Sequence, residues 1–459
     1  MSFIAAFLAG SFAYLGFAPN SIWIAPIISL FILNTVLDEK LLIKRIGLSQ
    51  VFGLGLLLPT QIWTGTYVGN APWILLAVIQ SILFWPFAIR FKRKRNINAL
   101  LFAFSAVVME LLLRTIPFTG FGWSRLSFTQ VNGPLAAIYP FLGCVGVIFV
   151  MAFLGSARRL FPISLVLLIV LGLNFIPASN RTGSSLRIAL VQGGVKDLGL
   201  NFNAKPREVF NSHLLTTING VKPNTVNLII WPENAADVDL YQYPDVRSSI
   251  VELSKSLNTP ILIGGISRSN GQLRNISAFF DPDISMVYTK RYLTPFGEYI
   301  PLRSFLQKFT NLTNQVEDFK AGLQNNSVII SENSAQVFIC YELLNDSFVR
   351  DVDSDFLIVQ TNNATFGNTK QLDQELQIAR VRALETGREV AYVSTTGITS
   401  FINSDGSIKS QIPKFQAAVL IDSVQMNGNQ NLSGKLSIYP ELFSISMILF
   451  LLIRNRRFA

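Results

Sequence analysis

Residues 226–235 read VNLIIWPENA, a short apolar run that ends in a proline and an acidic residue. Apolar runs rich in β-branched residues are typical of buried strands. Because proline has no N–H for the ladder of a sheet, Pro232 is expected to end the strand and to present Glu233 at its tip. The prediction of the fold therefore begins with a buried strand that carries a carboxylate at its end.

Five further runs of the same kind surround this one in the second half of the chain. They lie at 186–192, 260–264, 336–340, 355–360 and 390–396. Helical patterns lie between them, near 204–219, 246–257 and 371–387. Strands that alternate with helices favour a layered α/β domain over a β-sandwich, and we expect this domain at residues 178–437.

The chain outside this domain is strongly apolar. Half of the 459 residues are hydrophobic and 14% are charged, whereas a soluble protein carries about 25% charged residues. Apolar segments lie near 3–17, 21–37, 48–66, 71–90, 98–115, 132–155, 160–177 and 438–453. We therefore expect a bundle of about eight transmembrane helices, seven within residues 1–177 and one within residues 438–459.

The net charge of +10 indicates membrane topology and not nucleic-acid binding, because much of it lies in short clusters between the apolar segments. These clusters are Lys40, Lys44 and Arg45; Arg90 and residues 92–95; Arg158 and Arg159; and Arg454, Arg456 and Arg457. If the N-terminus is cytoplasmic and each segment crosses once, the loops 38–47, 91–97 and 156–159 and the C-terminal tail are all cytoplasmic. Residues 178–437 then lie on the far side.

Two cysteines and one histidine limit the chemistry of the chain. Cys144 lies in an apolar segment and Cys340 in the α/β domain, so we expect no disulfide framework. A single histidine excludes a histidine-rich metal site, and His213 is expected at the surface of a polar helix. Cys340 ends a predicted strand; it is either a buried structural thiol or a nucleophile. An unpaired thiol on the oxidising side of the membrane favours the nucleophile.

A cysteine nucleophile needs a base and a group that stabilises an oxyanion. The candidates are Glu233 and the charged residues Lys290 and Glu298 of KRYLTPFGEYIP, which begins at Lys290. Each of these charges alone would be a solvated surface group.

Taken together, WPE, K…PFGE and CYE resemble the nitrilase superfamily with its Glu-Lys-Cys triad. Seven apolar segments before the domain and one after it resemble the apolipoprotein N-acyltransferase branch. KRYLTPFGEYIPLR, ICYELL, RVRALETGRE at 380–389 and GWSRLSFTQ at 122–130 are similar to its hallmark blocks. The resemblance implies a nitrilase-like αββα sandwich beside the helical bundle.

The resemblance also implies a function. An enzyme of this branch would move an acyl chain from a phospholipid resembling phosphatidylethanolamine, through a cysteine thioester, to the α-amino group of an apolipoprotein's N-terminal S-diacylglyceryl-cysteine. It would lie in the bacterial inner membrane, with a periplasmic catalytic domain and both termini cytoplasmic. Neither a metal nor an organic cofactor is implied.

Residue roles follow from the same resemblance. Cys340 would be the nucleophile, Glu233 the general base, and Lys290 with the backbone N–H of Tyr341 the oxyanion site. Glu298 would hold the lysine and the glutamate in place. Glu342, Tyr341 and Asn275 match residues that lie near the thioester. The candidates for substrate contact are Trp123, Trp231, Thr365 and Phe366.

The chain departs from the family pattern at two positions. Thr365 stands in NNATFG where the family has tryptophan, and Gln374-Glu375 replaces Gln-His. Two other functions remain open. A membrane-tethered amidase would use the same triad with water as acceptor, and a degenerate paralogue would bind lipoproteins or lipid without catalysis. The intact set of Glu233, Lys290 and Cys340 argues against the paralogue.

Overall fold

The computed structural model describes residues 1–459 except 39, 67–68, 92–93, 177–182, 196, 200–203, 270, 308–316, 324–325, 429 and 457–459. The chain forms two compact units. A helical unit comprises Met1–Ala178, Asp373–Thr386 and Asn431–Ala459, and an α/β unit comprises Ser179–Leu372 and Gly387–Gln430. The predicted boundary at 177/178 lies outside the described residues.

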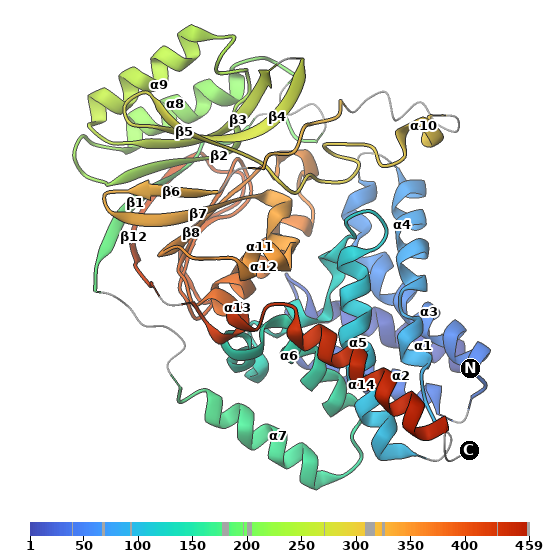
Figure 1. The fold of residues 1–459 in the computed structure, drawn as a ribbon. Helices are drawn as coiled ribbons and strands as arrows, with labels where there is room; N and C mark the ends of the chain where they lie inside the picture. Colours follow the sequence, from blue (N-terminus) through green and yellow to red (C-terminus); the bar gives the residue numbers. More distant parts are fainter. Residues whose placement is uncertain are drawn as a thin grey trace. The chain divides into compact units, whose positions relative to one another are not determined.

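Helices form in all eight apolar segments (Figure 1). They are α1 (Ser2–Ala13), α2 (Ile24–Leu37), α3 (Leu42–Thr60), α4 (Asn70–Ile82), α5 (Arg95–Thr115), α6 (Tyr139–Ser156), α7 (Leu160–Leu173) and α14 (Tyr439–Arg456). Within the described part of the chain, four helical stretches are long and apolar enough to cross a membrane, judged by length and composition. These four are Leu42–Thr60, Asn70–Ala88, Arg95–Thr115 and Pro134–Ser156. α1, α2 and α7 are apolar but shorter.

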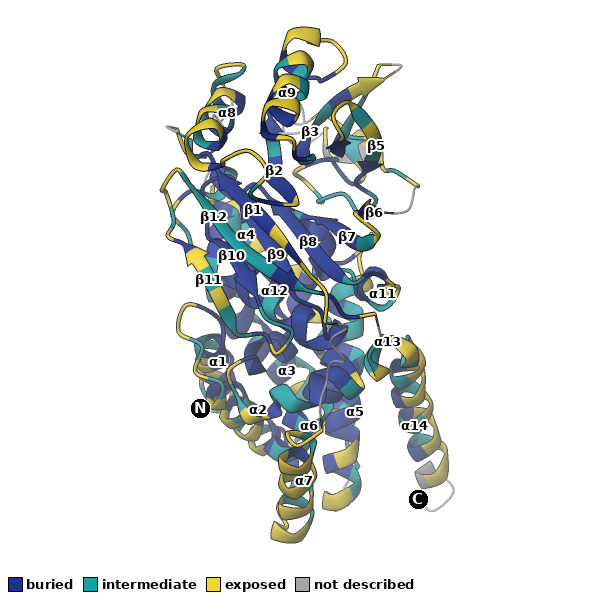
Figure 2. Ribbon diagram, turned by 90° about the vertical axis from the view of Figure 1, so that its left-hand side faces the viewer, coloured by how far each residue is buried: buried dark blue, intermediate teal, exposed yellow. Residues whose placement is uncertain are grey.

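Helix α7 shows that the helical unit is built for a lipid environment. Its sequence, LFPISLVLLIVLGL, is apolar on every side, and only Val170 is buried. Leu160 and Phe161 are 82% and 79% exposed, and Figure 2 shows most of the helix as exposed. A helix that is apolar all round requires a protein interior or a bilayer. Because little of α7 is covered by the part of the protein that the structure describes, its apolar surface indicates a membrane protein.

Three basic loops that are far apart in sequence meet within the helical unit. Arg45 donates from Nη1 to the carbonyl oxygen of Arg90 over 3.1 Å, and Arg90 pairs with Asp38 at 2.6 Å. Arg158 pairs with the other oxygen of Asp38. The segments around 38–45, 90 and 158 therefore lie at one end of the helical unit. Lys92, Arg93 and Arg457 lie outside the described residues.

Helix α12 (Gln371–Thr386) lies in the sequence between the two stretches of the α/β unit but belongs largely to the helical unit. Its polar side chains bond to the loops before α2 and α6 and to α6 itself. The bonds are Ala18 N to Gln377 Oε1 (2.9 Å), Trp123 Nε1 to Gln374 Oε1 (2.6 Å), Arg380 Nη2 to Asn132 Oδ1 (2.7 Å) and Cys144 N to Glu385 Oε1 (2.6 Å). Arg380 and Glu385 of the RVRALETGRE block therefore bond to other residues of the helical unit.

The α/β unit contains two six-stranded sheets. The first has the order β12-β1-β2-β3-β4-β5 and the second β11-β10-β9-β8-β7-β6. Strands of the first sheet are β1 (Ser185–Gln192), β2 (Leu228–Ala236), β3 (Ile261–Ser269), β4 (Gln272–Phe280), β5 (Ile284–Thr289) and β12 (Ala418–Gln425). Strands of the second are β6 (Ser327–Ile330), β7 (Asn333–Ile339), β8 (Phe356–Thr361), β9 (Val390–Ser394), β10 (Thr399–Ile402) and β11 (Ile408–Ile412). The six predicted strands are confirmed as β1, β2, β3, β7, β8 and β9.

The central strands are buried because both of their faces are covered. Helices α8 (Glu208–Gly220) and α9 (Pro244–Leu257) pack Phe210 and Ile250 against Trp231 and its neighbours on the first sheet. Gln360 of the second sheet donates from Nε2 to the carbonyl oxygen of Trp231 over 2.6 Å and so joins the two sheets. Figure 2 shows β1, β2, β8 and β9 as buried. Coverage on both faces explains why these strands read as continuous apolar runs.

The sequence predicted that strand β2 ends at Pro232, and this prediction is wrong. The strand continues to Ala236. Trp231 lies opposite Ile263 of β3 and Ala236 lies opposite Gly265, so the residues between them form a bulge and the strand then resumes. The missing N–H of Pro232 interrupts the ladder, which accounts for the bulge. A Cβ on Gly264 would lie 2.4 Å from the carbonyl oxygen of Pro232. The glycine therefore lets the bulge pack closely and fixes the position of Glu233.

The predicted surface position of His213 is wrong. Its side chain is 0% exposed, and its ring centroid lies 5.7 Å from that of Trp231. His213 lies one helical turn after Val209, whose carbonyl oxygen is 2.8 Å from Nδ1, and both residues lie on the buried face of α8. Burial lowers the pKa of His213 to about 4, so the ring is neutral at physiological pH.

Candidate active site

Four polar side chains from separate segments meet in the interior of the α/β unit. Glu233 comes from the bulge of β2, Asn275 from β4, Lys290 from the residue after β5, and Glu298 from the loop that follows. All four are at most 9% exposed. Nζ of Lys290 lies 3.2 Å from Oε1 of Glu233 and 2.9 Å from Oε2 of Glu298. Nδ2 of Asn275 donates to both carboxylates, each over 2.7 Å.

The flanking carboxylates determine the charge of Lys290. Burial by itself would lower the pKa of this amine, but Glu233 and Glu298, and then Cys340, raise it well above its usual value. The side chain is therefore an ammonium ion at neutral pH. A buried ammonium is tolerated because it is paired and hydrogen-bonded.

The carboxylate of Glu233 retains one acceptor position. Oε1 accepts from Asn275 and Lys290, and Oε2 accepts from the backbone N–H of Asn362 over 2.9 Å. A carboxylate offers about four lone-pair positions, so one is left to accept a proton. The contact with Asn362, directly after β8, was missed because any residue except proline supplies a backbone N–H.

Thr294 is a second residue that the sequence prediction missed. Its backbone N–H donates to Oε2 of Glu298 over 2.8 Å. Its Oγ1 lies 3.5 Å from Nζ of Lys290, at the outer limit of a hydrogen bond. The TPFGE segment thus folds back on itself and holds Glu298 against the lysine.

Cys340 follows the last residue of β7 and begins a short 3₁₀ helix, η8 (Cys340–Leu344). Its side chain is half-buried and its φ is +49°. A non-glycine residue in this left-handed region costs about 1–3 kcal/mol, and such strain concentrates at functional sites. Its thiol is close enough for its charge to raise the pKa of Lys290. The strand end therefore presents a strained cysteine to the charged cluster.

Glu342 ties the cysteine turn to the segment that carries Lys290. Its Oε2 accepts from the backbone N–H of Ile339 over 2.9 Å, and its Oε1 accepts from the Tyr288 hydroxyl over 2.6 Å and from Arg291 N over 2.8 Å. The side chain is fully buried. Burial raises the pKa of Glu342 to about 7, although the Tyr288 hydroxyl opposes the shift. Tyr341, which stands between Cys340 and Glu342 in the sequence, is also buried.

The four candidates for substrate contact occupy different environments. Trp231 is 0% exposed and donates from Nε1 to Oγ1 of Thr217 over 3.0 Å, so it contributes to packing and not to a binding surface. Trp123 belongs to the helical unit, and its ring centroid lies 4.8 Å from that of Trp63. Thr365 and Phe366 are half-buried in η9 (Ala364–Phe366), shortly after Asn362. Of the four, Thr365 and Phe366 thus lie three and four residues after Asn362, whose backbone N–H bonds to Glu233.

Comparison with known proteins matches both parts of the chain. Residues 9–157 match the apolipoprotein N-acyltransferase N-terminal domain, and residues 187–432 match the carbon-nitrogen hydrolase family. An apolipoprotein N-acyltransferase of Wigglesworthia glossinidia brevipalpis is 28% identical over 96% of this chain and 95% of its own. That of Coxiella burnetii is 28% identical over 99% of both chains. A solved CN-hydrolase superfamily protein of Xanthomonas campestris, 19% identical, covers 52% of this chain and 91% of its own at a TM-score of 0.39.

Proposed function

Because the chain belongs to the apolipoprotein N-acyltransferases of the carbon-nitrogen hydrolase superfamily, we propose that it transfers an acyl chain from a membrane phospholipid to the N-terminus of a lipoprotein. The observation that carries the proposal is the ammonium of Lys290, buried between two carboxylates beside the strained Cys340. The apolar half of the residues and the long apolar helices support a lipid substrate for this chemistry.

In the first step, the free acceptor position of Glu233 takes the proton of the Cys340 thiol. The thiolate attacks the carbonyl carbon of the phospholipid ester, and a C–S bond forms while the carbonyl oxygen becomes an oxyanion. The C–O bond of the ester then breaks, and the departing alkoxide takes the proton from Glu233. The products are a thioester on Cys340 and a lysophospholipid.

In the second step, the α-amino group of the S-diacylglyceryl-cysteine attacks the thioester. Glu233 accepts the amine proton, the C–S bond breaks, and the proton returns to the sulfur of Cys340. The amide product leaves and the free enzyme is restored. Splitting one difficult amide synthesis into two easier acyl transfers is the advantage of a covalent intermediate.

Lys290 is the natural stabiliser of the oxyanion. Two of its three N–H bonds are engaged by Glu233 and Glu298, while the third makes only the 3.5 Å contact with Thr294. That third N–H can turn to the developing oxyanion, together with the backbone N–H of Tyr341. Glu298 positions the lysine by pairing with it. Asn275 positions the base by donating to Glu233, and it also donates to Glu298.

The proposed location is the bacterial inner membrane, with eight spans, a periplasmic α/β domain and both termini in the cytoplasm. The meeting of the loops around Asp38, Arg90 and Arg158 supports a common side for them. The hydrogen bond between Ala18 and Gln377 supports the opposite side for α12, because Ala18 lies in a loop assigned to the far side. The proposed donor is a phospholipid such as phosphatidylethanolamine.

The test follows the acyl chain. The purified protein, in detergent micelles with phosphatidylethanolamine, is given a peptide that begins with S-diacylglyceryl-cysteine. The proposal expects triacylated peptide and lysophospholipid in equal amounts, and no product from a peptide whose α-amine is acetylated. Free fatty acid in place of the triacylated peptide would identify a hydrolase. The absence of both products would identify a lipid- or lipoprotein-binding paralogue.

A further inference from the structure

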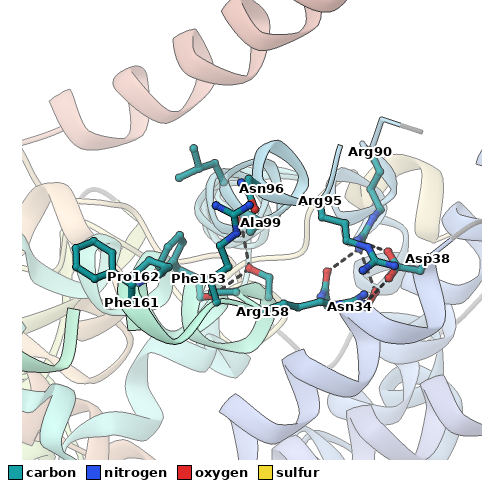
Figure 3. Close-up of a pocket in the computed structure, with 14 residues that line it drawn as sticks. Asn34, Asp38, Arg90, Arg95, Asn96, Ala99, Phe153, Arg158, Phe161 and Pro162 are labelled. Carbon is teal, nitrogen blue, oxygen red and sulfur yellow. Dashed lines mark hydrogen bonds and ion pairs between the residues drawn. The ribbon is translucent and has the colours of Figure 1, made fainter. Parts of the chain in front are cut away.

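The helical unit contains a cavity of about 410 Å³ where the basic loops meet (Figure 3). The end of α2, the first turns of α5 and the connection between α6 and α7 form its walls. A volume of this size is within the range of small-ligand sites, about 300–1,000 Å³. It shares no residue with the proposed active site, which lies in the α/β unit.

The wall of the cavity is strongly cationic. It includes four arginines, Arg90, Arg95, Arg158 and Arg159, and a single aspartate, Asp38. The lining residues therefore carry a net charge of +3. Arg90 donates to Asn34 Oδ1 over 2.7 Å and pairs with Asp38, and Arg158 pairs with the second oxygen of Asp38. The carboxylate is therefore fully engaged by two of the four arginines.

The other two arginines are available to a ligand. Arg95 and Arg159 are exposed and have neither an acidic partner nor a hydrogen-bond acceptor among the described residues. Arg95 also begins α5, where free backbone N–H groups add partial positive charge. Guanidinium groups bind phosphate through two parallel hydrogen bonds, so this pair suits a phosphate group.

The same cavity also has apolar lining residues. Leu100, Phe153 and Phe161 line it, and Phe161 is 79% exposed at the start of the lipid-facing helix α7. Positive charge retained only for topology would need nothing but solvent around it. A cavity that is lined by both arginines and an exposed phenylalanine fits a ligand that has both an anionic group and an apolar chain.

We propose that this cavity binds an anionic phospholipid, with its phosphate between Arg95 and Arg159 and an acyl chain along Phe161 and α7. Basic pockets between membrane helices on the cytoplasmic side are suited to anionic head groups. The proposal requires insertion in a membrane but not the proposed acyl transfer. It adds a lipid site at the end of the helical unit that carries the basic loops.

The test is native mass spectrometry of the full chain in neutral detergent, titrated with phosphatidylglycerol or phosphatidylcholine. Arg95→Gln/Arg159→Gln removes the two available arginines. Lys44→Gln/Arg454→Gln is the matched control, since it removes two exposed charges outside the cavity lining. Arg95→Lys/Arg159→Lys retains the charge of the site. Melting temperatures in lipid-free detergent verify that each variant is folded.

We expect phosphatidylglycerol to bind at least about tenfold more tightly than phosphatidylcholine, and the glutamine pair at the cavity to lose about tenfold in affinity. The control should stay within about threefold of wild type, and the lysine pair should fall between the two. Equal losses in the cavity variant and the control would overturn the proposal. So would displacement of the lipid by soluble glycerol phosphate, which would identify a site for a free anion.

Discussion

Glu233, which accepts hydrogen bonds from Asn275, Lys290 and Asn362, is the proposed general base. The Glu233→Gln variant keeps the size of the side chain but offers no group that can take the thiol proton. Acylation, measured as lysophospholipid release, should fall by about 10²- to 10⁴-fold without loss of the fold. Glu252→Gln, on the exposed face of α9, is the control and should leave the rate unchanged. A wild-type rate in Glu233→Gln would assign the base to another residue.

His213 provides a pH test of folding that is independent of activity. Its pKa is about 6.5 in the unfolded chain and about 4 in the folded one. Between these pH values His213 is protonated in the unfolded chain but neutral in the folded chain. The free energy of unfolding therefore decreases as the pH falls through this window. The full loss is about 3 kcal/mol.

The measurement compares the thermal unfolding of the α/β unit in wild type and His213→Phe between pH 7 and pH 4. The pKa of Glu342 is raised to about 7, so this group increases the free energy of unfolding as the pH falls. Its contribution is the same in wild type and in His213→Phe. The wild type should therefore lose stability relative to His213→Phe as the pH falls. Parallel curves would mean that His213 is protonated in the folded state.

The sequence identifies the residues of the site whose side-chain chemistry is distinctive, and it misses those that act through the backbone. Glu233, Lys290 and Glu298 stand out as charges at strand ends, and the structure brings them together. Asn362 acts through its N–H, which nothing in the one-letter code marks. Trp231 looks like a binding residue but packs in the core, because burial depends on the sheet and helices around it.

At the scale of elements, the bulge of β2 depends on Gly264. A Cβ there would lie 2.4 Å from the carbonyl oxygen of Pro232 and 2.6 Å from Cα of Glu233. Gly264→Ala should therefore displace the bulge, destabilise the protein by about 1–3 kcal/mol and slow acylation. Gly428→Ala is the control, since its nearest neighbouring atom would be 4.0 Å away. Thermal unfolding and lysophospholipid release measure both effects, and normal values in Gly264→Ala would contradict the role of the bulge.

The elements that the sequence predicts are those with the clearest periodicity. Buried central strands such as β2 and β8 are continuous apolar runs, so they are visible in the sequence. Strands such as β11, IKSQI, lie at the edge of a sheet and have consecutive polar residues, so they resemble ordinary loops. The affiliation of α12 with the helical unit rests on contacts such as Trp123 with Gln374, which no local pattern encodes.

At the scale of the whole molecule, the proposed orientation places Ser184 and Asn96 on opposite sides of the membrane. Single cysteines can be introduced as Ser184→Cys or Asn96→Cys in a Cys144→Ala/Cys340→Ala background. A membrane-impermeant thiol reagent added to intact spheroplasts should label the cysteine at position 184 and not the one at position 96. Labelling of both after lysis is the control, and the reverse pattern in intact cells would overturn the orientation deduced from the basic loops.

The central claim is that the acyl chain passes through Cys340, and mass spectrometry of the protein tests it most directly. The purified protein is incubated with phosphatidylethanolamine and no acceptor, and the peptide that contains Cys340 is then analysed. The proposed mechanism predicts that this peptide gains the mass of one acyl group, which neutral hydroxylamine removes, and that Cys340→Ala forms neither the adduct nor triacylated product. An unmodified Cys340 peptide, or transfer that persists in Cys340→Ala, would contradict it.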